Sequence, residues 1–356
     1  DALPPAARRW MTRPAAAGVA PARVRDVDAA GERLLVVADN EVSVVDAADG
    51  RRVAHWPEAR LVGAGVADTL RFIDRGNGAL ALASDGVGSE GMRSRLWLWR
   101  WVDGPAREIG DGNPVGALAS TPDGRWIASG EGSRWREGDG GEWRLAGRAQ
   151  LRLWDGQSGQ VARTLPFDAP VEAVAFSPSG ARLAARSGDA VVVFDTQRGD
   201  ELGRFAVGPD EGRAPGGLVF AGESRLLARE PGGVRVWSLA RDSSDRISLG
   251  TGPTALGVSP GGGHLLAFDD NGLRGLWSVA DGQRLVEPVA GLAPVSAWMP
   301  GDGALLLLDG RELRQLRWSA DALLAEGCRR AGGTLSDAEW ARYLPDAEPP
   351  GACEGR

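Results

Sequence analysis

Few residues in this chain could take part in acid–base or nucleophilic chemistry. Its two histidines, His55 and His264, do not stand beside a serine or cysteine in the pattern of a known catalytic arrangement. We therefore expect both to be structural, His55 in an outer strand and His264 at the start of a second strand. All 41 basic residues are arginine, which excludes a phosphate-binding loop of the Gly-Lys-Ser/Thr type. No catalytic residue is predicted, and the chain is not expected to be an enzyme.

Two acidic stretches, residues 46–50 and 269–272, have the composition of a calcium loop but not its spacing. Calcium takes about six to eight oxygen ligands, which a binding loop supplies at regular intervals. Aspartate, asparagine and glycine are also the residues that hairpin turns select. We therefore predict that both stretches are hairpin turns, and we predict no metal site and no cofactor.

The composition indicates which elements carry these residues. The chain of 356 residues has 52 glycines and 22 prolines, which recur between short apolar segments. This pattern is typical of all-β folds with many tight turns. The net charge of −7 argues against a nucleic-acid partner, for which a basic domain is expected. No stretch approaches the roughly 18 to 20 apolar residues of a membrane span, so no membrane insertion by this segment is expected.

One sequence pattern is repeated along the chain: a short apolar strand, a tight turn, a second strand, and a third strand ending in a large apolar and a polar residue. The clearest turns are Thr121-Pro122-Asp123-Gly124, Ser177-Pro178-Ser179-Gly180 and Ser259-Pro260-Gly261-Gly262. The seven third-strand endings are Val45-Asp46, Trp99-Arg100, Trp154-Asp155, Phe194-Asp195, Trp237-Ser238, Trp277-Ser278 and Trp318-Ser319. Most intervals between endings are about 40 to 45 residues, the length of one four-stranded propeller blade.

Trp154-Asp155 resembles the Trp-Asp dipeptide of WD40 repeats, and residues 20–318 resemble a WD40 propeller as a whole. The resemblance implies an all-β, seven-bladed β-propeller, in which each blade is buried against its neighbours and the ring closes. The Gly-His dipeptide of that family is absent here. Its absence puts in doubt the Asp–His–Ser/Thr–Trp hydrogen-bond network that joins the strands of many WD40 blades.

Closure of the ring needs a strand from elsewhere, because the seventh repeat has only three strands and ends at Trp318. The segment around Trp10 precedes the first repeat and has no repeat of its own. We predict that residues 7–14 supply the outer strand of the last blade. The propeller domain is then residues 1–320.

After Ser319 the apolar pattern changes from a period of two to a helical one. Residues 321–330 are compatible with a short helix, and Ser336 with Glu339 forms a capping box for a second. We predict a short C-terminal helical tail, residues 321–356, packed on the propeller. The tail resembles the C-terminal segment of bacterial WD40 proteins, STAND-type NTPase proteins among them, at Cys328, Leu335, Ser336, Trp340, Tyr343 and Cys353.

The chain has two cysteines, Cys328 and Cys353, and both lie in this tail. Cysteines that flank a small helical appendage with little core of its own favour a disulfide. The alternative is a pair of free thiols. A metal site is not expected, because two cysteines without a nearby histidine do not complete a tetrahedral shell.

The two longest intervals contain extra residues between the second and third strands of repeats 2 and 3. Residues 84–93 are predicted as a loop, and residues 133–145 as a hairpin in which Trp135 faces Arg144 and Arg136 faces Trp143. Both should project from one rim. Tryptophan and arginine are enriched at interface hot spots. We predict a partner-binding rim of Met92, Arg93, Arg134, Trp135, Arg136, Trp143 and Arg144; the alternative is that these tryptophans only pack the hairpin onto its own rim.

Two functional hypotheses follow. The first is a non-catalytic recognition, sensor or scaffold module for a protein or peptide. Resemblance to STAND-type proteins, and a start at Asp1 without Met, imply the C-terminal part of a larger bacterial protein. The second is a free-standing propeller that binds a small molecule or hydrolyses a substrate in its channel. A disulfide would favour an extracytoplasmic location and free thiols the bacterial cytoplasm; the oligomeric state is not predicted.

Overall fold

The computed structural model of the chain describes residues 23–28, 32–38, 41–46, 49–57, 69–88, 91–135, 144–208, 217–241, 243–249, 255–259, 261–269, 271–286, 289–290, 292–298, 304–309 and 312–317. In these ranges every regular element is a β-strand except one turn of 3-10 helix, η1 (Asp74–Gly76). The fold is therefore all-β, as the turn-rich composition predicts. The predicted closing segment (7–14) and helical tail (321–356) lie outside the described residues.

The strands form antiparallel sheets, which we number 1 to 7 in chain order. Sheet 1 contains β1 (Arg23–Val27), β2 (Arg33–Ala38), β3 (Glu41–Asp46) and β4 (Arg52–Trp56). Sheet 2 contains β5 (Thr69–Ile73), β6 (Gly78–Gly88), β7 (Gly91–Trp99) and β8 (Arg107–Glu108). Sheet 3 contains β9 (Val115–Ser120), β10 (Trp126–Trp135), β11 (Arg144–Asp155) and β12 (Val161–Pro166).

The remaining sheets repeat the same order of strands. Sheet 4 contains β13 (Val171–Phe176), β14 (Arg182–Ser187), β15 (Ala190–Asp195) and β16 (Glu201–Ala206). Sheet 5 contains β17 (Leu218–Ala221), β18 (Arg225–Glu230), β19 (Gly233–Ser238) and β20 (Ser243–Ser248). Sheet 6 contains β21 (Ala255–Val258), β22 (His264–Asp269), β23 (Gly272–Ser278), β24 (Arg284–Val286) and β25 (Val289–Ala290). Sheet 7 contains β26 (Leu292–Trp298), β27 (Ala304–Asp309) and β28 (Glu312–Arg317).

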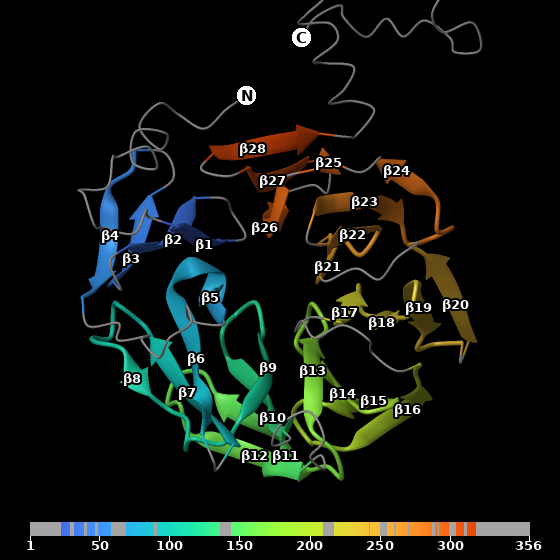
Figure 1. Cartoon of the computed structure of the whole chain (residues 1–356), viewed down its shortest axis with the longest axis horizontal. Coiled ribbons are helices and arrows are strands. Elements are labelled where there is room, and N and C mark those ends of the chain that lie inside the picture. The colour runs from blue at the N-terminus through green and yellow to red at the C-terminus, as the bar shows by residue number, and fades with distance from the viewer. Residues whose placement is uncertain are drawn as a thin grey trace, which may run out of the picture.

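The sheets stand around a common centre with the first strand of each sheet innermost (Figure 1). First strands of neighbouring sheets contact one another around much of the ring, and β1 contacts both β5 and β26. The first and last of the described sheets are therefore neighbours, and the ring closes between them. This is a propeller-like arrangement, in which the edge strands of each sheet are short and lie at the centre and at the rim of the ring.

The apolar core lies between successive sheets. One cluster joins Leu35 and Val44 of sheet 1 to Ala81 and Trp97 of sheet 2, and similar clusters join sheets 3 and 4, sheets 4 and 5, and sheets 5 and 6. The aromatic residues of the third-strand endings are buried in these layers, at Trp99, Trp154, Phe194, Trp237 and Trp277. Sheets 4 and 5 each contribute to two of these clusters, so they are apolar on both faces and depend on their neighbours for stability.

The glycine that recurs in the turn between the first two strands has a geometric role. Gly180 has a φ of +73°, in the left-handed region where side chains are strained. A Cβ at Gly180 would also lie 2.7 Å from Cγ2 of Thr121 in the preceding sheet. The missing side chain therefore allows both the turn and the close approach of sheet 4 to sheet 3.

Arginine side chains tie each of several sheets to the next. In six pairs the carbonyl belongs to the sheet that follows in the chain: Arg33 to Gly76, Arg100 to Gly156, Arg107 to Gln157, Arg163 to Gln197, Arg182 to Glu223 and Arg186 to Arg229. A seventh tie runs the other way, from Arg274 of sheet 6 to the carbonyl of Leu249 at the end of sheet 5. Arg186 is fully buried and donates a second hydrogen bond, of 2.6 Å, to the carbonyl of Gly208. The planar guanidinium, with five N–H donors, suits such bridging better than an ammonium group.

Candidate functional site

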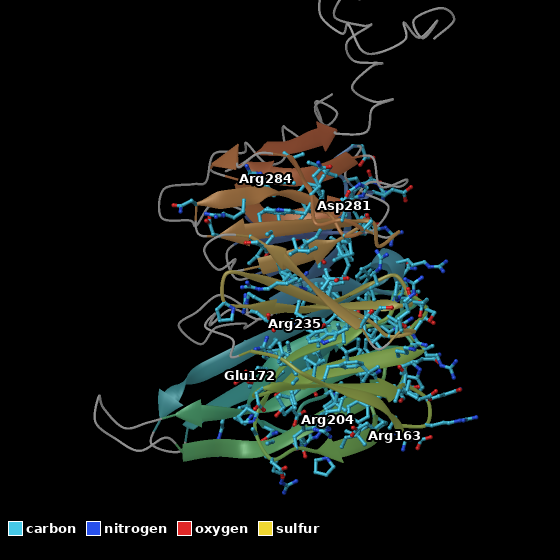
Figure 2. The ribbon with its side chains drawn as sticks, turned by 90° about the vertical axis from the view of Figure 1, so that its right-hand side faces the viewer. Arg163, Glu172, Arg204, Arg235, Asp281 and Arg284 are labelled. Carbon is cyan, nitrogen blue, oxygen red and sulfur yellow. The ribbon has the colours of Figure 1, made fainter. Side chains whose placement is uncertain are left out.

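The second and third strands of sheets 2 and 3 are longer than those of the other sheets. They have 11 and 9 residues in sheet 2, and 10 and 12 in sheet 3, whereas the corresponding strands β14 and β15 of sheet 4 have 6 each. The extra length projects from one face of the ring, which we call the hairpin face (Figure 2). Strands β7 and β11 contact each other, so the two extensions project from neighbouring sheets.

The extension of sheet 2 differs from the predicted loop at residues 84–93. Strand β6 continues to Gly88 and pairs with β7 from Gly91, with Ser84 opposite Ser94 and Gly88 opposite Gly91. The segment is therefore a second hairpin. The glycines and serines that suggested an irregular loop are compatible with a strand here because the ladder continues from the buried part of the sheet.

The predicted rim residues fall on these hairpins. In sheet 3 the strand register places Trp135 opposite Arg144 and Arg134 opposite Leu145, and the first of these pairs is the one that the sequence predicts. Met92 and Arg93 lie in β7, where Arg93 is exposed. Arg136 and Trp143 lie outside the described residues, as do the side chains of Met92, Arg134, Trp135 and Arg144.

A buried carboxylate fixes the base of the sheet 3 hairpin. The Glu131 side chain is 1% exposed and is surrounded by donors. Its Oε1 accepts a hydrogen bond of 2.7 Å from the hydroxyl of Ser129, and its Oε2 accepts one of 2.7 Å from the amide of Gln150. The amide of Asn113 also donates to Oε2, across the connection from sheet 2 to sheet 3. Because a buried charge is stable only when it is paired and hydrogen-bonded, this arrangement is specific to one geometry of the hairpin base.

The network extends to both sides of Glu131. On one side, the indole Nε1 of Trp154 donates to the Ser129 hydroxyl at 2.9 Å. On the other, Nε of the buried Arg152 lies 3.4 Å from Glu131 Oε2, and its NH2 donates to Asp111 at 2.6 Å. The hydrogen bond from Arg152 lowers the pKa of Asp111 despite an opposing effect of partial burial. Both carboxylates therefore face one guanidinium, which links the hairpin base to the connection before β9.

A bulge at Gly132 changes the direction of the hairpin where it leaves the sheet. The register of β10 and β11 shifts between Glu131 and Ser133, and Gly132 has a φ of +94°. The Gly132 N–H donates to the carbonyl of Pro114 rather than to the neighbouring strand. The side-chain NH2 of Asn113 donates to the Arg148 carbonyl, and the side-chain oxygen of Asn113 accepts from the Arg148 N–H. Bulges of this kind re-aim the strands that follow them.

Sequence reasoning missed this network. Its signal was present, because Ser129 and Glu131 alternate along an otherwise apolar second strand, as do Gln150 and Arg152 along the third. Polar residues at a period of two within buried strands indicate a polar network on one face. Paired carboxylates also end the second strand in two other sheets without this alternation: in sheet 5 the buried Glu230 lies 2.5 Å from Arg235. In sheet 6, Asp269 is paired with Arg274 at 3.2 Å.

The two histidines and one of the acidic stretches lie where the sequence predicts. His55 Nε2 is 2.9 Å from Glu41 Oε2 on the neighbouring strand, and His264 begins β22 as predicted. Asp269 Oδ1 accepts a hydrogen bond from the Asn271 N–H, which is the turn role expected for that acidic stretch. Within these ranges no group of three or more His, Cys, Asp or Glu side chains is arranged to hold a metal ion. Nor does any described helix have the length and apolar character to cross a membrane.

The predicted disulfide partners Cys328 and Cys353 lie outside the described residues. Comparison with known proteins adds no family to this geometry: no protein-family model matches the chain, and no curated protein matches it.

Proposed function

We propose that the chain is a seven-bladed, WD40-like propeller that acts as a non-catalytic recognition module, with a protein or peptide partner that docks on the hairpin face. The observation that carries the proposal is the pair of hairpins on the neighbouring sheets 2 and 3. Their strands have 9 to 12 residues, whereas the corresponding strands of sheet 4 have 6 each. Adjacent projections with a fixed base suit recognition, since loops on a rigid scaffold are where proteins commonly place binding residues.

Rigidity of the hairpin base supports this role. Glu131 and its donors hold β10, β11 and the preceding connection together at the point where the hairpin emerges. A surface that is already ordered loses less conformational entropy on binding. Beyond this base, Trp135 lies opposite Arg144 in the hairpin. Tryptophan and arginine are among the residue types most enriched at interface hot spots.

The hydrogen bond from Trp154 to Ser129 supports the WD40-like assignment. It joins a third-strand tryptophan to a second-strand hydroxyl, which is the Ser/Thr–Trp part of the network expected of that family. Here Glu131 accepts from the serine in the position where the network would have its histidine. The resemblance of the tail to STAND-type proteins supports a sensor or scaffold role within a larger bacterial protein.

The test is a comparison of the full chain with its W135A/W143A double variant as bait in a lysate of the source bacterium. A partner should be retained by the wild-type chain and by Val102→Ala, a control at an exposed apolar residue away from the hairpins. The double variant should lose it by at least tenfold, measured with the purified partner by calorimetry, while its melting temperature stays within about 2 °C. A partner bound equally by the double variant would refute docking on the hairpin face, and a large fall in melting temperature would support packing of the tryptophans instead.

A further inference from the structure

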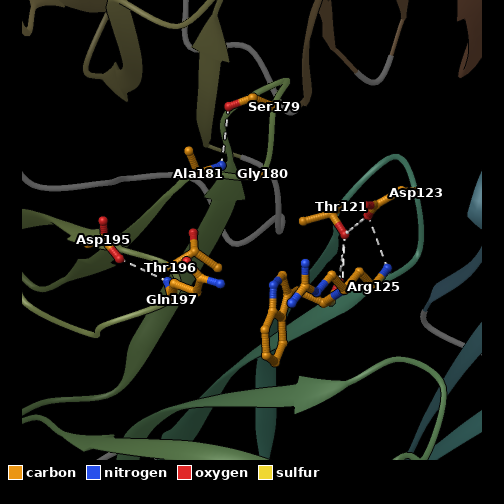
Figure 3. A pocket seen from close by; sticks show the side chains of 10 residues that line it. Thr121, Asp123, Arg125, Ser179, Gly180, Ala181, Asp195, Thr196 and Gln197 are labelled. Atoms are coloured by element: carbon orange, nitrogen blue, oxygen red, sulfur yellow. Dashed lines mark hydrogen bonds between the residues drawn. The ribbon is translucent and has the colours of Figure 1, made fainter.

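The opposite face of the ring, which carries the turns between first and second strands and between third and fourth strands, has a pocket of its own. It has a volume of about 210 Å³ and lies between sheets 3 and 4. Asp123, Arg125 and Trp126 line it from the first turn of sheet 3, and Asp195, Thr196 and Gln197 from the last turn of sheet 4 (Figure 3). The volume is below the roughly 300 to 1,000 Å³ of pockets for drug-sized ligands, so an occupant must be small.

Thr196 provides a hydroxyl with no role in the fold. The residue is 3% exposed, and its Oγ1 has no hydrogen-bond partner among the described residues. Its backbone N–H is fixed by a hydrogen bond of 3.0 Å to the carbonyl of Ala181. A buried hydroxyl without a partner destabilises the folded state, because its hydrogen bonds to water are lost without replacement. Such a group at the wall of a cavity is available to a ligand.

Arg125 provides a cation on the other wall, where its charge also interacts with Asp123 and Asp155. Its guanidinium carbon lies 5.4 Å from the centroid of the Trp126 ring, and the side chain makes no hydrogen bond within the described part of the chain. The cation–π contact orients the guanidinium without using its N–H donors. In Figure 3, Arg125 stands on the side of the pocket opposite Thr196 and Asp195. The donors suit a carboxylate, which a guanidinium binds in a bidentate manner.

The two aspartates each have one oxygen to spare. Asp195 Oδ1 accepts hydrogen bonds from the N–H groups of Gln197 and Arg198, at 3.0 and 2.7 Å. Asp123 Oδ1 accepts from the Thr121 hydroxyl at 2.6 Å and from the Arg125 N–H at 3.0 Å. For both residues Oδ2 makes no hydrogen bond to the described residues. Acceptors and donors therefore face one another across a small cavity.

We propose that this pocket binds a small zwitterion of the size of a free α-amino acid, with its carboxylate on Arg125, its ammonium group on Asp195 and a polar atom on the Thr196 hydroxyl. A ligand with only a positive charge would be repelled by Arg125, and one with only a negative charge by the two aspartates. A zwitterion matches both walls at once, and the exposed part of the Trp126 ring accommodates an apolar portion of the ligand. The site is independent of the hairpin face.

Calorimetric titration of the full chain with the free L-amino acids tests the proposal. At least one should bind with a dissociation constant in the millimolar range or tighter, which corresponds to about −4 kcal/mol. Its N-acetyl and carboxamide derivatives, each lacking one charge, should bind at least tenfold more weakly. The proposal is overturned if no free amino acid binds, or if the blocked derivatives bind as well as the parent.

Substitutions locate the site. Arg125→Gln and Asp195→Asn should each weaken binding at least tenfold. Asp46→Asn is the matched control, because Asp46 ends the third strand of sheet 1 as Asp195 does in sheet 4, accepts a hydrogen bond from the Asp49 N–H in the turn that follows, and does not line the pocket. Equal losses in D46N and D195N would refute the assignment.

Thr196→Val separates binding from stability. It removes an unsatisfied hydroxyl, so the melting temperature should not fall, whereas affinity should fall several-fold. Unchanged affinity in T196V would also contradict the proposal. The W135A/W143A variant should bind the amino acid normally. A negative result for the pocket is therefore distinguishable from a negative result for the hairpin face.

Discussion

Removal of the Glu131 side chain should destabilise the protein more than any change at an exposed carboxylate. Glu131→Ala leaves the Ser129 hydroxyl, the Gln150 and Asn113 amides and the Arg152 guanidinium without their shared acceptor. Hydrogen bonds to charged groups contribute roughly 1.5–3 kcal/mol each but are not additive. Breaking a buried ion pair from one side costs about 3–5 kcal/mol. We expect the free energy of unfolding to fall by about 3–5 kcal/mol.

The expected change is measurable by thermal and urea denaturation. With about 2.1 cal/mol/K of unfolding entropy per residue, this chain has roughly 0.75 kcal/mol/K, so the melting temperature should fall by about 4–7 °C. Glu131→Gln keeps one acceptor oxygen and places an amide donor toward Ser129, so it should cost only about 1–2 kcal/mol.

Glu41→Ala is the control. Its side chain is 44% exposed and pairs with His55, so its loss should cost less than about 1 kcal/mol. If E131A loses no more stability than E41A, the network does not fix the hairpin base, and the rigidity on which the proposed docking face depends is absent.

Three further outcomes follow. Gly180→Ala should lower the free energy of unfolding, measured by urea titration, by about 2–3 kcal/mol, because of its positive φ and the contact with Thr121. Gly188→Ala is the control: its φ is +61° but the space around its Cβ is open, so it should cost only about 1 kcal/mol. Arg186→Lys should cost about 2–3 kcal/mol, because one ammonium group does not replace two bonds to carbonyls 2.6 and 2.7 Å away; a loss below about 0.5 kcal/mol would contradict this. Hydrogen bonds from the N–H and hydroxyl of Ser158 lower the pKa of Asp155. Its stabilising effect is therefore present above the unfolded pKa of about 3.9 and is lost as the pH falls further, so the deficit of Asp155→Asn relative to wild type should shrink between pH 7 and pH 3.

The repeat pattern predicted the layout of the sheets because each turn and each third-strand ending has a local physical cause. Ser177-Pro178-Ser179-Gly180 forms the expected tight turn, and the buried Trp154 and Trp237 end their strands as expected. The alternation of polar and apolar residues also placed Trp135 opposite Arg144, since register in a hairpin follows from the tip and the period of two.

The ties between sheets were not predictable from single repeats. Arg186 looks like any strand arginine in the sequence, yet it is fully buried because the carbonyls of Arg229 and Gly208 lie within its reach in the folded ring. The pocket beside Thr196 depends in the same way on two turns about 70 residues apart. Such contacts depend on how neighbouring sheets are rotated, and no local sequence pattern records that rotation.

The direction of the arginine ties has a consequence for assembly. In most of the ties the arginine of one sheet donates to a carbonyl of the next sheet, so these sheets associate head to tail, as subunits do in a heterologous interface. Head-to-tail units either close into a ring or continue without end. The contact of β1 with β26 closes the set within one molecule. A chain in which that contact is weakened would expose two complementary ends, and it should form domain-swapped oligomers or filaments rather than an open monomer.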